Sequence, residues 1–151
     1  MNVIMKRTKQ KGRGVFAARS LTSGDVVVRG RFLKALASRT HHSFEVGFDE
    51  HIELDEPARV INHSCDPNTG IQNNQFGGYN FIALRPIQVG EEITWDYETS
   101  EYTSIAVKRC FCGSAKCRKH IVGFQFREEE LRTKYGEYLA GYLTQKVHRV
   151  K

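Results

Sequence analysis

The chain has 151 residues, of which 40% are hydrophobic and 26% charged, and its formal net charge is +6. This length and composition favour one folded domain with its own core and exclude a disordered chain. No apolar run approaches the ~20 residues of a membrane span and the opening residues are too polar for a secretory signal, so we expect an intracellular protein, cytoplasmic or nuclear, in its own cell or in a host.

The first half of the chain reads as short strands separated by turns. From Gly14 the strand-like run GVFAA is followed by a turn at residues 22–25 and then by three valines. Such β-branched and aromatic runs, bounded by Gly and Asp, are typical of strands. The later segment LRPIQVGEEITWDY repeats the pattern of ARSLTSGDVV, with Gly24 matching Gly90. We interpret the repeat as one turn used twice, since two copies are too few for a solenoid.

Two further elements are predicted towards the C-terminus. In EEITWDY, Ile93, Trp95 and Tyr97 alternate with Thr94 and Asp96, which predicts a strand with the first three residues on one face. The segment REEELRTKYGEYLAGYL carries Leu and Tyr at helical spacing and acids in its first turn. This pattern predicts one amphipathic helix that packs on the core. The sequence therefore indicates a mostly β fold with short strands and a C-terminal α-helix.

Four cysteines suggest a metal site. Cys110, Cys112 and Cys117 lie in a short glycine-containing loop, CFCGSAKC, where close-spaced thiols can converge on one tetrahedral ion. Zinc takes four thiolates, and Cys65 is the only candidate for the fourth. Two alternatives stay open. Cys65 can be a buried small hydrophobe beside a trio that binds nothing, or two cysteines can form a disulfide, which a reducing compartment disfavours.

Four segments together resemble one family. They are KGRGVF at residues 11–16, NHSCDPN at 62–68, GEEITWDY at 90–97 and CFCGSAKC at 110–117. In this order and spacing they resemble the motifs of the SET-domain protein lysine methyltransferases, with the last segment similar to the post-SET zinc loop. Any one of them alone would be a weak signal, but the resemblance covers nearly all of the chain. The tail is more similar to small bacterial or viral SET proteins.

The resemblance implies the SET fold, a β-clip of short strands with a pseudo-knot-like threading of residues 62–65. It implies three regions: a SET domain at 1–105, a post-SET zinc loop at 106–124, and a C-terminal helix and tail at 125–151. It also implies that Cys65 joins the three loop cysteines on one structural Zn²⁺.

The same resemblance implies a protein-lysine methyltransferase that uses S-adenosylmethionine. Tyr97 would be the catalytic residue, because its hydroxyl can orient the lysine amine and polarise the transferred methyl group. The residues that would bind the cofactor are Lys11, Gly12, Arg13, Asn62 and His63. For His63 the family's contact is made by the backbone, so a buried, hydrogen-bonded histidine side chain is compatible with it.

The chain departs from the family at two places. Trp95 stands where relatives carry Phe or Tyr, at a position that lines the substrate lysine channel, and we expect its larger ring to restrict the number of methyl groups added. After Cys117 many relatives have Cys-Arg-Gly and then an aromatic residue that covers the cofactor. Here the chain reads Arg118-Lys119-His120, and either His120 or Phe124 is expected to take that position.

The expected partner is a protein segment with a basic, lysine-containing sequence, such as a histone-like tail. The acidic run from Glu45 to Glu56 either attracts such a segment or is simply a solvated face. The net charge leaves nucleic acid as a secondary partner, and no membrane partner is expected. The rival hypothesis is a SET fold that binds peptide or nucleic acid without catalysis, against which the presence of Asn62, His63 and Tyr97 argues.

Overall fold

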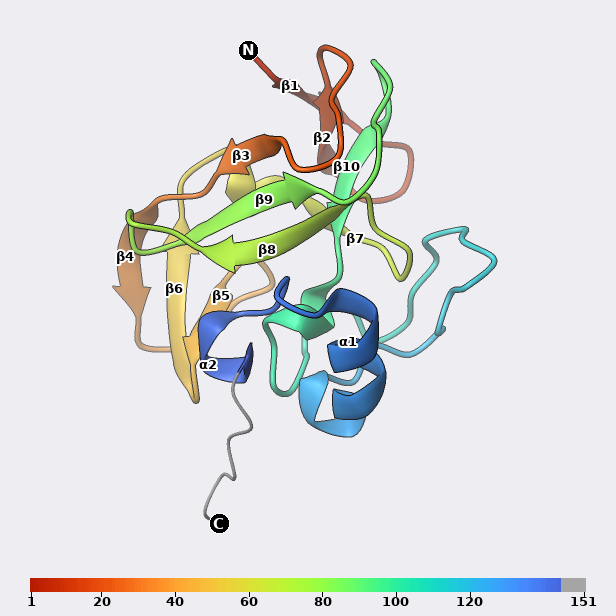
Figure 1. The fold of residues 1–151 in the computed structure, drawn as a ribbon. Helices are drawn as coiled ribbons and strands as arrows, with labels where there is room; N and C mark the ends of the chain where they lie inside the picture. Colours follow the sequence, from red (N-terminus) through yellow and green to blue (C-terminus); the bar gives the residue numbers. More distant parts are fainter. Residues whose placement is uncertain (145–151) are drawn as a thin grey trace.

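The computed structural model describes residues 1–144, which form three small sheets followed by short helices (Figure 1). The first sheet has the order β1-β2-β10-β7, with β1 Val3–Arg7, β2 Arg13–Ala17, β7 Asn62–His63 and β10 Glu92–Trp95. The second has the order β3-β9-β8, with β3 Val26–Arg29, β8 Thr69–Asn73 and β9 Tyr79–Ala83. The third has the order β4-β6-β5, with β4 Phe32–Leu36, β5 Phe44–Gly47 and β6 Glu50–Leu54. The prediction of a mostly β fold is confirmed.

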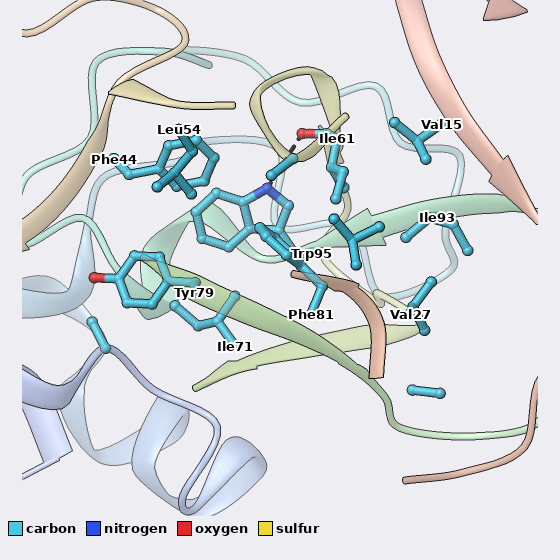
Figure 2. Packing of buried hydrophobic residues seen from close by; sticks show 14 of the residues in the cluster. Val15, Val27, Phe44, Leu54, Ile61, Ile71, Tyr79, Phe81, Ile93 and Trp95 are labelled. Carbon is cyan, nitrogen blue, oxygen red and sulfur yellow. Dashed lines mark hydrogen bonds between the residues drawn. The ribbon is translucent and has the colours of Figure 1, made fainter. Parts of the chain in front are cut away.

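One hydrophobic core joins the three sheets, and Trp95 contacts all of them (Figure 2). Its ring is stacked on Phe44 of β5, with centroids 5.3 Å apart and planes 16° apart. It also meets the edge of Phe81 of β9 at 5.7 Å and 85°. Offset and edge-on contacts of this kind stabilise aromatic pairs beyond simple burial. The last residue of β10 therefore holds the sheets together as well as leading into the next segment.

The two copies of the predicted turn exchange backbone hydrogen bonds. Leu21 and Ile87 occupy equivalent positions and form an antiparallel bridge, in which each N–H donates to the other's carbonyl at 2.9 Å. Gly24 and Gly90 have φ angles of +94° and +90°, which glycine adopts without strain. Each glycine N–H donates to a carbonyl just before the other copy, at 2.8 and 2.9 Å. The sequence repeat therefore marks a local two-fold arrangement of two turns.

β7 and β10 pair in parallel, with Asn62 opposite Thr94 and His63 opposite Trp95. Parallel neighbours require the chain to leave the sheet and return to it. β10 enters between β2 and β7, and this pairing sets the second motif directly beside the third. This pairing is compatible with the pseudo-knot-like threading that the resemblance implies.

The predicted strand face is correct for Ile93 and Trp95, which are 0% and 3% exposed, but it does not extend to Tyr97. β10 ends at Trp95, and a 3₁₀ turn, η2 (Tyr97–Thr99), begins with Tyr97. Asp96 caps this turn, because its side chain accepts a hydrogen bond from the Glu98 N–H at 3.1 Å. The cap turns Tyr97 out of the sheet, towards the cleft described below.

The single C-terminal helix predicted from the sequence is divided in the structure. After the 3₁₀ turn η3 (Phe124–Phe126), helix α1 spans Glu128–Tyr135 and helix α2 spans Gly141–Thr144. α1 ends at Gly136, whose φ of +57° suits glycine at a helix C-terminus. The apolar stripe is nevertheless buried in the common core, at Leu131, Tyr135, Leu139 and Leu143. Residues 145–151, the end of the predicted tail, lie outside the described residues.

A third short turn, η1 (Ala58–Val60), leads into β7. Within residues 1–144, no helix has the length and apolar composition that crossing a membrane requires.

Candidate active site and metal centre

The four cysteines converge on one point. Cys65 follows β7 and the other three lie in the loop before η3, yet all four sulfur atoms lie within 4.8 Å of one another. The Sγ atoms of Cys65 and Cys110 are 3.8 Å apart, and all four thiols are free. A tetrahedral ion with bonds of about 2.3 Å to sulfur sets its ligands about 3.8 Å apart. The donor set and its spacing therefore fit zinc, and the disulfide alternative has no support.

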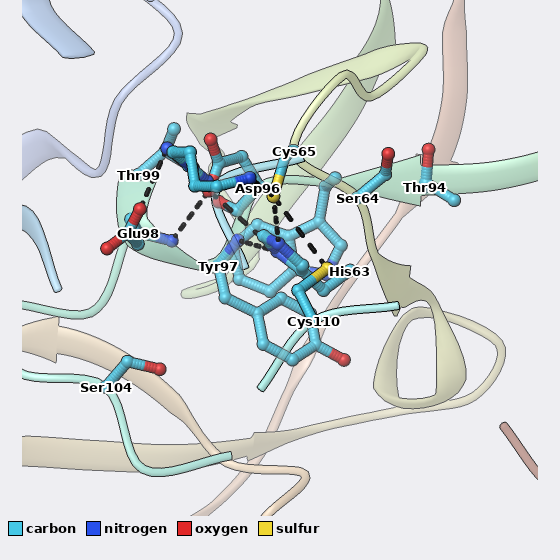
Figure 3. Close-up of polar contacts among 12 residues, drawn as sticks. His63, Ser64, Cys65, Thr94, Asp96, Tyr97, Glu98, Thr99, Ser104 and Cys110 are labelled. Atoms are coloured by element: carbon cyan, nitrogen blue, oxygen red, sulfur yellow. Dashed lines mark hydrogen bonds and ion pairs between the residues drawn. The ribbon is translucent and has the colours of Figure 1, made fainter. Parts of the chain in front are cut away.

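His63 connects this cluster with Tyr97 (Figure 3). The backbone N–H of Tyr97 donates to Nδ1 of His63 at 3.0 Å, so Nδ1 is unprotonated and the ring hydrogen is on Nε2. Nε2 lies 3.4 Å from Sγ of Cys65. Burial, followed by the positive charge of Arg118, lowers the pKa of His63 to about 3, so the ring is neutral. A neutral imidazole that donates to a thiolate orients a metal ligand.

A cleft of about 310 Å³ opens beside the cysteine loop. Four of the residues predicted for cofactor binding or catalysis line it: Lys11, Asn62, His63 and Tyr97. Cys110 and Cys112 form part of the same wall. The motifs at the two ends of the chain therefore meet at one cleft.

Gly12 and Arg13 do not line this cleft. Gly12 forms the turn before β2, with a φ of +71°, and the Arg13 side chain pairs with Glu56 at 3.0 Å. The Arg13 carbonyl accepts a hydrogen bond from the Asn62 amide at 3.0 Å. The Arg13 backbone therefore helps to position Asn62, and cofactor binding by Gly12 and Arg13 stays a prediction.

Sequence reasoning missed several residues that line the cleft, among them His41, His42, Arg109 and Phe111. Phe111 is 72% exposed, and the Arg109 guanidinium lies 5.3 Å from its ring centroid. Its position between two cysteines of the loop could have predicted that Phe111 lies beside the cleft. The two histidines lie in a segment with no motif, and only the fold brings them to the cleft.

The two residues expected to cover the cofactor lie elsewhere. Phe124 is 1% exposed and belongs to the hydrophobic core, so it cannot reach the cleft without unfolding η3. His120 is exposed and pairs with Arg109 through a backbone bridge. The exposed aromatic ring beside the cleft is Phe111 instead.

A second, much smaller hollow of about 10 Å³ lies on another side of Tyr97. Its walls include the rings of Phe44, Trp95 and Tyr97 together with Arg59 and Glu101. His41, His42 and Tyr97 line both hollows, so Tyr97 lies at their boundary. We call this hollow the aromatic slot.

Trp95 and Tyr97 are fixed by the same backbone oxygen. Nε1 of Trp95 donates to the Ile61 carbonyl at 3.3 Å, and the Tyr97 hydroxyl donates to it at 3.2 Å. Burial raises the pKa of Tyr97 above its ordinary value, and the negative charges of Glu101 and Glu92 act in the same direction. The hydroxyl therefore keeps its proton, and its position depends on the segment that precedes β7.

A buried ionic network surrounds the turn that carries Tyr97. The side chains of Asp96 and Glu98 are 0% exposed, and Arg118 pairs with them at 2.7 and 2.8 Å. Arg127 also pairs with Glu98 at 3.1 Å, and the Tyr135 hydroxyl donates to Asp96 at 2.8 Å. These contacts join the cysteine loop and helix α1 to η2.

The acidic run from Glu45 to Glu56 is largely paired within the fold. Glu45 is buried, and its carboxylate accepts two backbone N–H bonds at 3.2 and 2.8 Å. Glu53 pairs with a lysine of β4 at 3.6 Å, and Glu56 pairs with Arg13 at 3.0 Å. This pairing reduces the net negative charge that the run could present to a basic peptide.

A family model described as the SET domain matches residues 12–98, which is more than half of the chain. The chain belongs to the SET-domain family. Histone-lysine N-methyltransferase Set2 of Drosophila melanogaster is 31% identical over 137 residues, covering 78% of this chain and 6% of that protein. Histone-lysine N-methyltransferase SETD2 of Homo sapiens is 30% identical over 136 residues, covering 77% of this chain and 5% of that protein. The chain thus spans a small fraction of these relatives.

A smaller relative and a solved structure agree with this placement. Methyltransferase flvH of Aspergillus flavus is 32% identical over 97 residues, which cover 64% of this chain and 54% of that protein. The crystal structure of KRYPTONITE in complex with mCHG DNA and SAH matches with a TM-score of 0.61 and 26% identity, over 79% of this chain and 28% of that one. A second structure, in complex with mCHH DNA, H3(1-15) peptide and SAH, matches with a TM-score of 0.59.

Proposed function

We propose that the chain is a protein-lysine methyltransferase that uses S-adenosylmethionine. The observation that carries this proposal is the position of Tyr97 at the boundary between the 310 Å³ cleft and the aromatic slot. Transfer between a bulky donor and a protein acceptor needs the two to arrive from different sides and meet with their reacting atoms aligned. The names of the relatives, several of them histone-lysine N-methyltransferases, support the same reaction.

The cleft has the groups that a nucleoside-linked amino acid requires. Asn62 offers a side-chain amide, held by the Arg13 carbonyl and by Glu92 at 3.0 and 2.9 Å. Lys11, which pairs with Glu92 at 2.9 Å, brings a cation to the wall of the cleft, and Phe111 offers an exposed ring on which a flat base can stack. SAH in two matching structures supports this ligand class. S-adenosylmethionine would supply a methyl group bonded to a positively charged sulfur.

The aromatic slot suits the aliphatic part of a lysine side chain. Phe44, Trp95 and Tyr97 present apolar surface, and an environment without water favours the neutral amine that the reaction needs. The Tyr97 hydroxyl is in place to orient the amine at the end of the slot. At about 10 Å³ the slot is smaller than a lysine side chain, so substrate binding requires the exposed His41 and His42 to move aside.

Zinc bound by Cys65, Cys110, Cys112 and Cys117 would have a structural role. The four ligands leave no open coordination position for catalysis. The ion would fix the loop that forms one wall of the cleft against the end of β7. We therefore propose that zinc stabilises the wall of the cofactor site and takes no part in the reaction.

The proposed substrate is a histone-like tail or a similarly basic segment. A matching structure contains an H3(1-15) peptide, and the relatives are named for histone lysines. A histone substrate would make a nucleus, its own or a host's, the place of action. Nucleic acid remains a secondary partner, supported by the net charge of +6 and by the DNA in the matching structures.

Transfer of labelled methyl groups from S-adenosylmethionine tests the proposal. Core histones and a whole-cell lysate would be incubated with the wild type and with Tyr97→Phe, and cofactor binding would be measured by calorimetry. We expect labelled protein bands that weaken about 100-fold in the variant while the cofactor still binds, because one positioned donor has been removed. Cofactor binding by the wild type without labelling of any protein would instead support the non-catalytic binding module.

A further inference from the structure

Glu101 is a buried carboxylate in the wall of the aromatic slot. It follows Tyr97 by four residues and is 4% exposed. The Ser104 hydroxyl donates to one of its oxygens, and the Arg39 guanidinium lies 3.8 Å from the other. At 3.8 Å Arg39 is at the long end of an ion pair, so it compensates the buried carboxylate less than a close, hydrogen-bonded pair would.

Apart from Arg39, the charged groups around Glu101 do little to favour its ionised form. Glu45 of β5 and Glu98 of η2 are themselves acidic, and both act against ionisation of Glu101. Arg59, His41 and His42 line the slot from other segments. Arg59 is already paired with Glu56.

The electrostatics of the slot agree with this geometry. Burial is the main reason that the pKa of Glu101 rises to about 7, and the Ser104 hydrogen bond and the Arg39 charge only partly oppose it. The negative charge of Glu101 also raises the pKa of Tyr97. Glu101 and Tyr97 line the same hollow, so the carboxylate faces the space beside the tyrosine.

We infer that Glu101 receives the ammonium group of the substrate lysine and removes its proton. This inference rests on the proposed function and adds a catalytic residue to it. The slot otherwise has the aromatic rings that exclude water, and its other possible bases, His41 and His42, are exposed, whereas Glu101 is buried. The ammonium group that enters the slot meets a buried carboxylate whose cationic partner, Arg39, is 3.8 Å away.

The proton transfer balances as follows. One N–H bond of the lysine ammonium breaks, its electron pair stays on nitrogen, and the proton bonds to a carboxylate oxygen of Glu101. The neutral amine then forms a bond to the methyl carbon, while the carbon–sulfur bond breaks and its electron pair stays on sulfur. The products are a methylated ammonium group and a neutral thioether. Glu101 finally releases its proton to water.

The test compares the pH dependence of kcat/KM in the wild type and in Glu101→Gln, with core histones and S-adenosylmethionine. For the wild type we expect a plateau above about pH 7, where Glu101 is ionised and the lysine is still charged. The variant depends on the small neutral fraction of lysine, about 1 in 2,500 at pH 7 for a pKa of about 10.4, so we expect about a 1,000-fold loss at pH 7. This loss should shrink about tenfold per pH unit up to pH 9.

Two further variants separate catalysis from structure. Glu101→Asp keeps a carboxylate and should retain the wild-type shape of the pH profile at a lower rate. Glu129→Gln removes an exposed acid of α1 and should match the wild type. Calorimetric binding of S-adenosylmethionine and thermal unfolding would be measured for every variant.

Parallel pH profiles of kcat/KM for the wild type and Glu101→Gln would overturn the inference. A loss of rate in the variant that is explained by weaker binding of S-adenosylmethionine would also overturn it. If Glu101→Gln does not fold, the Glu101→Asp profile decides, and a shape unrelated to the wild type's would overturn the inference as well. If the wild type transfers no methyl group at any pH, the proposed function fails first, and the role of Glu101 fails with it.

Discussion

Arg118 and Asp96 form a buried ion pair, 2.7 Å between Nη2 and Oδ1, that joins the residue after Cys117 to the residue before Tyr97. The same guanidinium pairs with Glu98, just after Tyr97, at 2.8 Å. One side chain therefore contacts both neighbours of the tyrosine. Arg118 therefore couples the conformation of the cysteine loop to the position of the Tyr97 hydroxyl, which lies at the boundary between the cleft and the aromatic slot.

Replacing Arg118 should damage both stability and turnover. Arg118→Ala leaves two buried carboxylates without their main partner, so we expect the free energy of unfolding to fall by about 3–5 kcal/mol. We also expect kcat to fall more than KM for S-adenosylmethionine rises, because the cleft survives while Tyr97 shifts. Urea unfolding and steady-state kinetics measure these effects. Arg118→Lys should recover part of kcat, and Lys116→Ala, which alters an exposed cation of the same loop, is the control.

Removing a zinc ligand should loosen the cysteine loop and leave the sheets intact. We expect one zinc per wild-type chain by elemental analysis, and loss of that zinc in Cys65→Ser. The Cys110 amide, which donates to the Lys119 carbonyl at 2.7 Å, should then exchange its hydrogen faster, while the amides that pair β2 with β10 stay protected. A chelator should reproduce the effect in the wild type, and added zinc should reverse it. Unchanged exchange in the loop after metal removal would contradict this structural role.

Replacing Trp95 should change the number of methyl groups on the product. The indole is stacked on Phe44 and bonded to the Ile61 carbonyl, so it cannot turn away from the slot. A smaller ring in Trp95→Phe leaves room beside Tyr97 for an amine that already carries methyl groups. Mass spectrometry of the product should find mainly monomethyllysine for the wild type and more di- and trimethyllysine for the variant. Abundant trimethyllysine from the wild type would be the contrary result.

Stability should depend on pH through Glu101. Its pKa is about 7 in the folded protein against an ordinary value of 4.5, so between these values the folded state binds more protons than the unfolded one. The stability contributed by the protonated form is complete below about pH 4.5 and is lost as pH rises through about 7. A shift of this size corresponds to about 3 kcal/mol. Urea unfolding from pH 5 to pH 8 should therefore show the wild type losing stability relative to Glu101→Gln. If the free energy of unfolding changes equally with pH in both proteins, Glu101 is not a buried carboxylate that ionises in this range.

Local patterns in the sequence were sufficient for several features of the fold and the site. The strand-forming runs, the repeated turn with Gly24 and Gly90, and the four-cysteine set follow from residue types at short spacings. Their chemistry is carried by the residues themselves, since positive φ favours glycine and zinc favours thiolates. The error at α1 has a local cause as well, because Gly136 sits inside an otherwise helical pattern and ends the helix.

The sequence by itself determined the family, the fold class and the residues on which the proposed chemistry depends. Only the tertiary structure decided which of them share a cavity. It brought His41 and Phe111 to the cleft, paired Arg118 with Asp96, and enclosed Glu101 in the slot with Trp95. The first two join segments that are separated in the chain, and all of them depend on burial and charge. No period or spacing in the sequence encodes them, because burial and charge pairing are fixed only when the three sheets pack on one core.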